Sequence, residues 1–204
     1  MSNLVPMVLH RSDNGERAMD IFSLMLEKRI IYMSGPVNTT MSDIIIASLQ
    51  KLEFDDPDAD IYMYINSPGG SVSDGLAMLG VMETISCDIV TIVTGMAASM
   101  GSFIATCGGT AGKRYMCTHA QAMAHQPSGG AQGQSSDIVI TANHIVKTRE
   151  TLEKIYAEHT GQSYEKINKL CDRDHWMDAS EAVELGFADK ILTPELVKEM
   201  RSGK

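Results

Sequence analysis

The stretch DIVTIVTGMAASMGSFIATC, residues 88–107, decides the fold class. It begins with the apolar run DIVTIV at 88–93, passes through small residues at 95–101 and continues as the apolar SFIATC. An unbroken apolar run is typical of a strand that is buried on both faces, as in a parallel sheet covered by helices. The small residues indicate a tight turn from that strand into a helix, with Ser99 at the turn. The stretch therefore predicts an α/β fold.

The neighbouring segments repeat this alternation of strand and helix. Strands are predicted at 29–33, 60–65 and 88–93, and helices at 41–54, 71–85 and 99–107. Two further short strands are predicted at 113–117 and 120–124, before HQPSGGAQGQ at 125–134, which is too rich in Gly, Pro and Gln for a regular core element. This pattern predicts a mainly parallel sheet covered by helices.

A long helix is predicted from Ser136 to the Gly161 region, where glycine can take a left-handed helix-ending conformation. Its apolar residues recur at helical spacing: Ile138, Ala142, Ile145, Leu152 and Ile155. Such a helix needs a partner for its apolar stripe. We expect self-association, and the alternative is that the helix folds back onto its own domain.

The composition bounds the function classes. The 204 residues suit a single domain, and the net charge of −9, without any Lys/Arg block, argues against nucleic-acid binding. No apolar run is long enough for a membrane span, and the first residues do not resemble a secretory signal. None of the 4 cysteines forms a CxxC pair, so we expect reduced thiols in a cytoplasmic protein.

Ser99 has two readings. The pattern Ala97-x-Ser99-x-Gly101 is close to the elbow that exposes a nucleophilic serine between a strand and a helix, where free backbone N–H groups can stabilise an oxyanion. Serine is also a common helix N-cap without any chemistry. The local pattern alone favours the cap.

A second turn, INSPGGSVSDG at 65–75, strengthens the catalytic reading. Its paired glycines leave backbone N–H groups uncovered, as an oxyanion hole requires, and Ser71-x-x-Asp74 predicts a capping box for the next helix. We expect strands to end at Ile65 and Thr94. Both turns would then lie at the same edge of a parallel sheet, where such folds place their sites.

A nucleophilic serine needs a base and a carboxylate. His125 is the best placed histidine, because it ends a predicted strand before a Gln-Pro turn; His119 stays a competitor. His10 lies in a flexible-looking start, and His144 and His159 lie on the predicted long helix, where we expect them to be solvated. His175 is the remaining histidine. The cluster CDRDHWMD leaves the carboxylate open among Asp172, Asp174 and Asp178.

Five motifs in this order resemble the ClpP family, the proteolytic subunits of Clp proteases: YINSPGG, GMAASMGSF, MAHQPSGGAQGQ, HTGQS and DRDHWMDASEAVELGFADKIL. The resemblance implies that Ser99 is the nucleophile, His125 the general base and Asp174 its orienting carboxylate. It also implies an oxyanion hole made by the backbone N–H groups of Gly70 and Met100.

The same resemblance implies the architecture and partners. The fold would be one crotonase-like α/β domain over 1–204, with an axial loop at about 1–17 and a projecting handle at about 126–160. Two stacked rings of seven subunits would receive unfolded proteins from a hexameric Clp ATPase of the ClpX or ClpA/ClpC type. No metal or cofactor is implied, because the partner uses the ATP. Peptide would bind along Pro127, Gly129 and Gly130, and the ATPase would dock on Tyr64, Tyr115 and Leu192.

Two other functions are compatible with parts of this pattern. A crotonase-type acyl-CoA enzyme also uses backbone N–H groups to hold an oxyanion, but it needs no acylated serine. A non-catalytic ring subunit would support assembly alone, and the presence of Ser99, His125 and Asp174 argues against it.

Overall fold

A computed structural model describes residues 5–12 and 15–202 of the chain. The strands are β1 Met7–Ser12, β2 Gly15–Asp20, β3 Ile30–Ser34, β4 Ile61–Ser67, β5 Ile89–Ala98, β6 Arg114–Cys117, β7 Gln121–Ala124, β8 His175–Asp178 and β9 Lys190–Leu192. The helices are α1 Ile21–Glu27, α2 Thr39–Asp55, α3 Val72–Met82, α4 Met100–Cys107, α5 Ser135–Thr160, α6 Tyr164–Leu170, α7 Ala179–Glu184 and α8 Pro194–Ser202.

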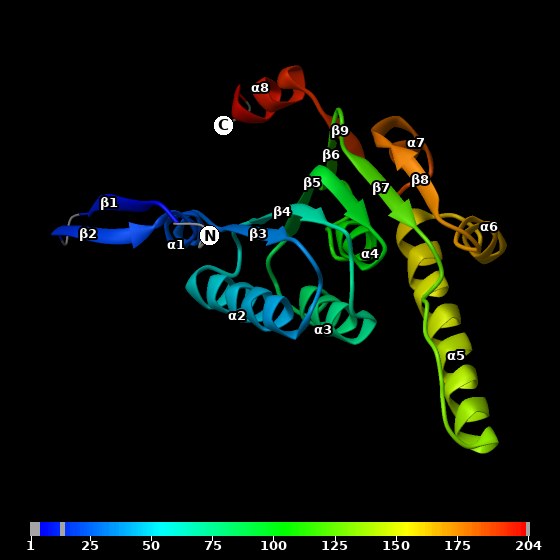
Figure 1. Cartoon of the computed structure of the whole chain (residues 1–204). Helices are drawn as coiled ribbons and strands as arrows, with labels where there is room; N and C mark the ends of the chain where they lie inside the picture. Colours follow the sequence, from blue (N-terminus) through cyan, green and yellow to red (C-terminus); the bar gives the residue numbers. More distant parts are fainter. Residues whose placement is uncertain (1–4, 13–14, 203–204) are drawn as a thin grey trace.

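A mainly parallel sheet forms the centre of the molecule. Its order is β3-β4-β5-β6-β9, and β7 pairs with β5 beyond β6. All of these pairings are parallel, and β8 is added antiparallel to β7. Helices α2 and α3 lie together along one side of the sheet (Figure 1). The predicted α/β fold with a mainly parallel sheet is confirmed.

β5 is longer than the sequence indicated, and this places Ser99. The sequence predicts a strand end at Thr94, but β5 continues to Ala98, pairing with β6 over 91–93 and with β7 over 96–98. Likewise β4 ends at Ser67 rather than Ile65, after a register shift. Asn66 lies in this irregular stretch, where its side-chain oxygen accepts a hydrogen bond from Met96 N–H at 3.1 Å. That side-chain bond and the small residues after Thr94 let the strand continue where the pattern indicated a turn.

Helix α4 is the core element that carries the start of the site. All 8 of its residues, Met100 to Cys107, are buried, so it has no solvent-facing polar stripe. Apart from the buried hydroxyls of Ser102 and Thr106 its side chains are apolar, as is typical of a helix inside the molecule. Because Ser99 immediately precedes α4 and follows β5, its position is fixed by two buried elements.

α3 begins as the sequence predicts. Ser71 Oγ accepts a hydrogen bond from Asp74 N–H at 3.4 Å. The second half of the capping box is absent, because Ser71 N–H donates to the carbonyl oxygen of Val37 at 2.9 Å. The Asp74 carboxylate instead accepts from the Thr39 hydroxyl at 3.3 Å, which joins α3 to α2.

Helix α5 projects from the body of the molecule (Figure 1). It ends at Gly161, whose φ of 71° is left-handed as predicted. Its first half leaves large apolar side chains exposed, namely Ile138, Val139, Ile140 and Val146. Only Leu152, Glu153 and Tyr156 are fully buried. The first half therefore does not fold back onto its own domain.

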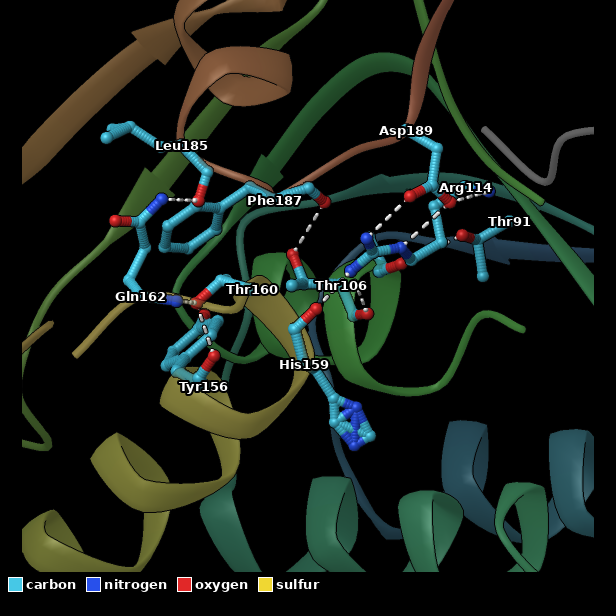
Figure 2. Close-up of polar contacts among 11 residues, drawn as sticks. Thr91, Thr106, Arg114, Tyr156, His159, Thr160, Gln162, Leu185, Phe187 and Asp189 are labelled. Carbon is cyan, nitrogen blue, oxygen red and sulfur yellow. Dashed lines mark hydrogen bonds and ion pairs between the residues drawn. The ribbon is translucent and has the colours of Figure 1, made fainter. Parts of the chain in front are cut away.

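The C-terminal end of α5 is fastened to the sheet by a buried arginine (Figure 2). Arg114 Nη1 donates to the carbonyl oxygen of His159 at 2.9 Å, and its Nη2 donates to Asp189 Oδ1 at 2.6 Å. His159 is half-buried rather than solvated, and desolvation lowers its pKa.

The N-terminal strands β1 and β2 form an antiparallel hairpin. His10 lies on β1, with its Nε2 at 3.7 Å from Glu27 Oε2, so this part of the start is ordered. Residues 1–4 and 13–14 of the predicted axial loop, and 203–204 of the predicted domain, lie outside the described residues. Within the described ranges, no helix combines the length and the apolar character that crossing a lipid bilayer requires.

Candidate active site

Ser99 occupies an unusual backbone conformation, with φ 54° and ψ −123°. Its N–H donates to the carbonyl oxygen of Met123 at 2.8 Å, and its carbonyl oxygen accepts from Phe103 N–H at 3.0 Å. The side chain makes no capping hydrogen bond. Instead Ser99 Oγ lies 2.8 Å from His125 Nε2. The cap interpretation of the side chain is therefore wrong.

His125 reaches Ser99 because of the sheet. It follows β7 directly, and β7 pairs parallel to β5 with Ala98 opposite Met123. Two residues leaving neighbouring parallel strands at the same edge lie close together. His119 is at the opposite end of β7, roughly 20 Å of extended chain from His125, and it is exposed. The structure thus brings His125 and not His119 to the serine.

Asp174 is the member of the acidic cluster that meets the histidine. Its Oδ1 lies 2.9 Å from His125 Nδ1. Asp178 instead caps α7 by accepting from Glu181 N–H at 2.9 Å, and the Asp172 carboxylate is 4.0 Å from Arg149. A ring whose Nδ1–H donates to Asp174 and whose Nε2 accepts from the serine hydroxyl satisfies both contacts. This is the geometry of a serine activated by an oriented base.

The two backbone N–H groups predicted for the oxyanion hole lie beside Ser99. Met100 N–H is the first of α4 and, within the described residues, has no acceptor. Gly70 forms a parallel β-bridge with Val37. The two hydrogen bonds of this bridge are made by the neighbours of Gly70: the Gly69 carbonyl oxygen accepts from Val37 N–H, and Ser71 N–H donates to the Val37 carbonyl oxygen. The N–H of Gly70 itself therefore points away from Val37. A Cβ on Gly69 would meet Met100 N at 2.7 Å, which places this turn against the elbow. Among the bonds of the described residues neither N–H group has an acceptor, so both are available to an oxyanion.

A small cleft of about 20 Å³ opens beside the serine. Its lining is mainly apolar: Val72, Ser99, Met100, Phe103, His125, Gln126, Pro127, Leu152, Glu153, Tyr156 and Cys171. Of the predicted peptide-binding residues, Pro127 lines this cleft. Gly129 and Gly130 do not; both are exposed, and a Cβ on Gly129 would meet Ile145 Cδ1 of α5 at 2.8 Å.

Comparisons with known proteins decide the family. A family model described as Clp protease matches residues 13–195. The chain belongs to the Clp protease family. A protein of Ligilactobacillus salivarius is 53% identical over 190 residues, covering 93% of this chain and 96% of that protein. A protein of Streptococcus pneumoniae is 49% identical over 191 residues, covering 93% and 97%. Both are described as ATP-dependent Clp protease proteolytic subunits.

Membership in the Clp protease family makes the chain a peptidase. The alternative function, a crotonase-type acyl-CoA enzyme, is not supported by this membership. The thiol of Cys171 also lines the cleft, but burial raises the pKa of that thiol to about 12. The thiol is therefore protonated near neutral pH and does not compete with Ser99. The described residues hold no cluster of side chains suited to a metal ion.

The three residues predicted for partner docking come together. Tyr115 of β6 is buried with Val90 and Ile92, and both Tyr64 of β4 and Leu192 of β9 pack against this group. They form a small apolar cluster separate from the main core of this Clp protease. The structure places the residues side by side; their docking role stays a prediction.

Sequence reasoning missed three polar residues around the site. Gln126 and Glu153 line the cleft, and Arg149 donates to both of them. The one sequence signal was the Arg149–Glu153 spacing of four residues, which suits an ion pair on a helix. Gln126 gave no signal because its partners are distant in the sequence.

Proposed function

We propose that this chain is the serine endopeptidase subunit of an ATP-dependent Clp protease, with Ser99, His125 and Asp174 as its catalytic triad. The observation that carries the proposal is the continuous contact from Ser99 Oγ to His125 Nε2 at 2.8 Å and from His125 Nδ1 to Asp174 Oδ1 at 2.9 Å.

The geometry supports acyl transfer. His125 takes the hydroxyl proton as Ser99 Oγ attacks the peptide carbonyl carbon, while Asp174 stabilises the imidazolium. The N–H groups of Gly70 and Met100 bind the oxygen of the tetrahedral intermediate. His125 then gives the proton to the leaving amine, and water releases the acyl group from Ser99 by the same steps in reverse order.

The proposal extends to assembly and partners. The relatives' description as ATP-dependent proteolytic subunits supports an ATPase partner. We take this partner to be a hexameric Clp ATPase that uses the ATP and supplies unfolded protein, and we propose that this chain needs no cofactor of its own. The apolar cluster of Tyr64, Tyr115 and Leu192 is the proposed docking surface for that ATPase. The exposed apolar residues of α5 support contact between two stacked heptameric rings. Pro127, Gly129 and Gly130 lie on the extended segment before α5, which suits an edge that pairs with peptide.

The test combines labelling with sizing. A fluorophosphonate probe should phosphonylate Ser99 Oγ with loss of fluoride, and the labelled species should elute as a particle of about fourteen subunits. Ser99→Ala should lose the label and should lower peptide hydrolysis on the order of 10⁴-fold or more. Hydrolysis that persists unchanged in Ser99→Ala would reject the triad, whereas a labelled monomer would reject only the assembly.

A further inference from the structure

A set of polar side chains outside the triad joins α5 to the segments that carry the triad. Arg149 is at its centre: Nε donates to Glu153 Oε1 at 2.7 Å, and Nη1 donates to Gln126 Oε1 at 2.9 Å. Gln126 Nε2 in turn donates to the carbonyl oxygen of Asp172 at 2.7 Å. Gln126 is the residue after the proposed base, and Asp172 lies two residues before Asp174.

Glu153 holds the guanidinium in one orientation. Its side chain is 2% exposed, and its other oxygen accepts from Asn168 Nδ2 at 2.8 Å. A buried carboxylate is costly unless its oxygens are satisfied, and here each oxygen has a donor. The hydrogen bond to Glu153 raises the pKa of Arg149. The guanidinium group is planar and rigid, so the hydrogen bond of Nε to Glu153 also fixes the direction of Nη1, which points at Gln126.

The contact between His125 and Asp174 is held from two sides. On one side the β7–β8 ladder pairs Ala124 with His175. On the other side Gln126 bridges the same two segments, since its backbone N–H donates to the carbonyl oxygen of Cys171 at 2.7 Å in addition to its side-chain bond. Removing the side-chain bridge would leave the base and its carboxylate fixed mainly by the ladder.

We propose that Arg149 is a positioning residue for the His125–Asp174 pair and that it acts through Gln126. The inference deepens the proposed function and rests on it, since it requires that this pair activates Ser99. Arg149 touches neither the serine nor the imidazole, so its effect is on the placement of the base. Small displacements of a catalytic group lower the rate of the chemical step.

Arg149→Lys is the decisive variant. A lysine still places a positive charge beside Glu153, but it has no second N–H group directed at Gln126. We expect kcat for a fluorogenic peptide, counted per site that the fluorophosphonate labels, to fall about tenfold, with KM within about twofold of wild type. Lys154→Met, an exposed change one turn later on α5, should leave both values unchanged.

Gln126→Met and the double variant Arg149→Lys/Gln126→Met test the route. If Arg149 acts through Gln126, the decrease in kcat of the double variant should be no larger than the greater of the two single-variant decreases. The inference would be overturned if Arg149→Lys kept the wild-type kcat or changed KM alone. It would also be overturned if the two single-variant decreases in kcat multiplied in the double variant. Failure of the fluorophosphonate to label Ser99 in the wild-type protein would instead reject the proposed function, before any variant is compared.

Discussion

At the scale of single residues, the proposed nucleophile Ser99 lies in a strained backbone conformation. A φ of 54° with a ψ of −123° is a conformation that residues with a side chain rarely adopt. Its backbone is held by the carbonyl oxygen of Met123 and the N–H of Phe103. Strain of this kind costs about 1–3 kcal/mol and is maintained by the surrounding structure. The same conformation turns Oγ away from the first turn of α4 and toward His125.

Strain at Ser99 predicts that glycine stabilises the fold while activity is lost. We expect the free energy of unfolding of Ser99→Gly to exceed that of Ser99→Ala by about 1 kcal/mol, after the larger entropy of glycine in the unfolded chain is subtracted. Urea denaturation of the two variants at one protomer concentration measures the difference. A glycine variant no more stable than the alanine variant would show that position 99 is unstrained.

The residues of the proposed triad differ in how far the sequence alone predicts them. Ser99 and His125 each follow a recognisable strand, so their meeting at one sheet edge could be expected from the parallel topology. Asp174 could not be separated from Asp172 and Asp178 without the family resemblance, because the choice depends on how β8 pairs with β7. Long-range pairing of short strands leaves no local pattern.

At the scale of elements, the Pro-Gly-Gly turn is built against the strand-to-helix elbow. Gly69 has a φ of 85°, and a Cβ there would lie 2.5 Å from the carbonyl oxygen of Ala98 and 2.7 Å from Met100 N. Both contacts are with backbone, which cannot move aside like a flexible side chain. This packing therefore fixes the positions of the two N–H groups, of Gly70 and Met100, that we propose as oxyanion donors.

Gly69→Ala should separate these two segments. We expect it to lower the free energy of unfolding by at least about 2 kcal/mol and to lower kcat on the order of a hundredfold, since a methyl group must displace the backbone at Met100. Gly80→Ala is the matched control: Gly80 is exposed on α3, and a Cβ there would meet nothing within 4 Å, so this change should stabilise slightly. Full peptidase activity in Gly69→Ala would contradict the packing argument.

A second element-level prediction concerns the fastening of α5. Burial by itself would raise the pKa of Asp189, but the hydrogen bonds and charge of Arg114 outweigh it and keep that pKa below its ordinary value (Figure 2). A lowered folded-state pKa contributes stability above the unfolded value of 3.8, and this contribution is lost as pH falls through the folded-state pKa. Wild type should therefore be more stable than Asp189→Asn at pH 6, and the difference should shrink below about pH 4.

Denaturant unfolding of both proteins at pH 6, 5, 4 and 3 measures this difference. Other carboxylates titrate equally in the two proteins, so the comparison isolates Asp189. If the difference in the free energy of unfolding stayed constant over this pH range, the interaction with Arg114 would not stabilise the charged form of Asp189.

At the scale of the whole molecule, the sheet body could be predicted from the sequence but the projection of α5 could not. Alternating strand and helix patterns specify which elements form, and the mainly parallel sheet follows from them. Whether a long helix packs on its own domain depends on the surface that the rest of the chain presents. Here α5 contacts mainly α4 and α6, at its C-terminal half, while its first half extends away from the sheet (Figure 1).

The exposed first half of α5 predicts assembly through that helix. The side chains of Ile140 and Val139 are 67% and 57% exposed. Helix propensity alone does not stabilise a projecting helix, which needs an apolar face packed against a partner. We expect Ile140→Lys to shift the particle toward smaller species, because a charge buried in an apolar contact is costly. Light scattering over a dilution series measures the mass, and Thr151→Lys adds the same charge at an exposed polar position nearer the body. Equal masses for the two variants would place the assembly contact elsewhere on the molecule. A wild-type protein that is monomeric at every concentration would contradict assembly altogether.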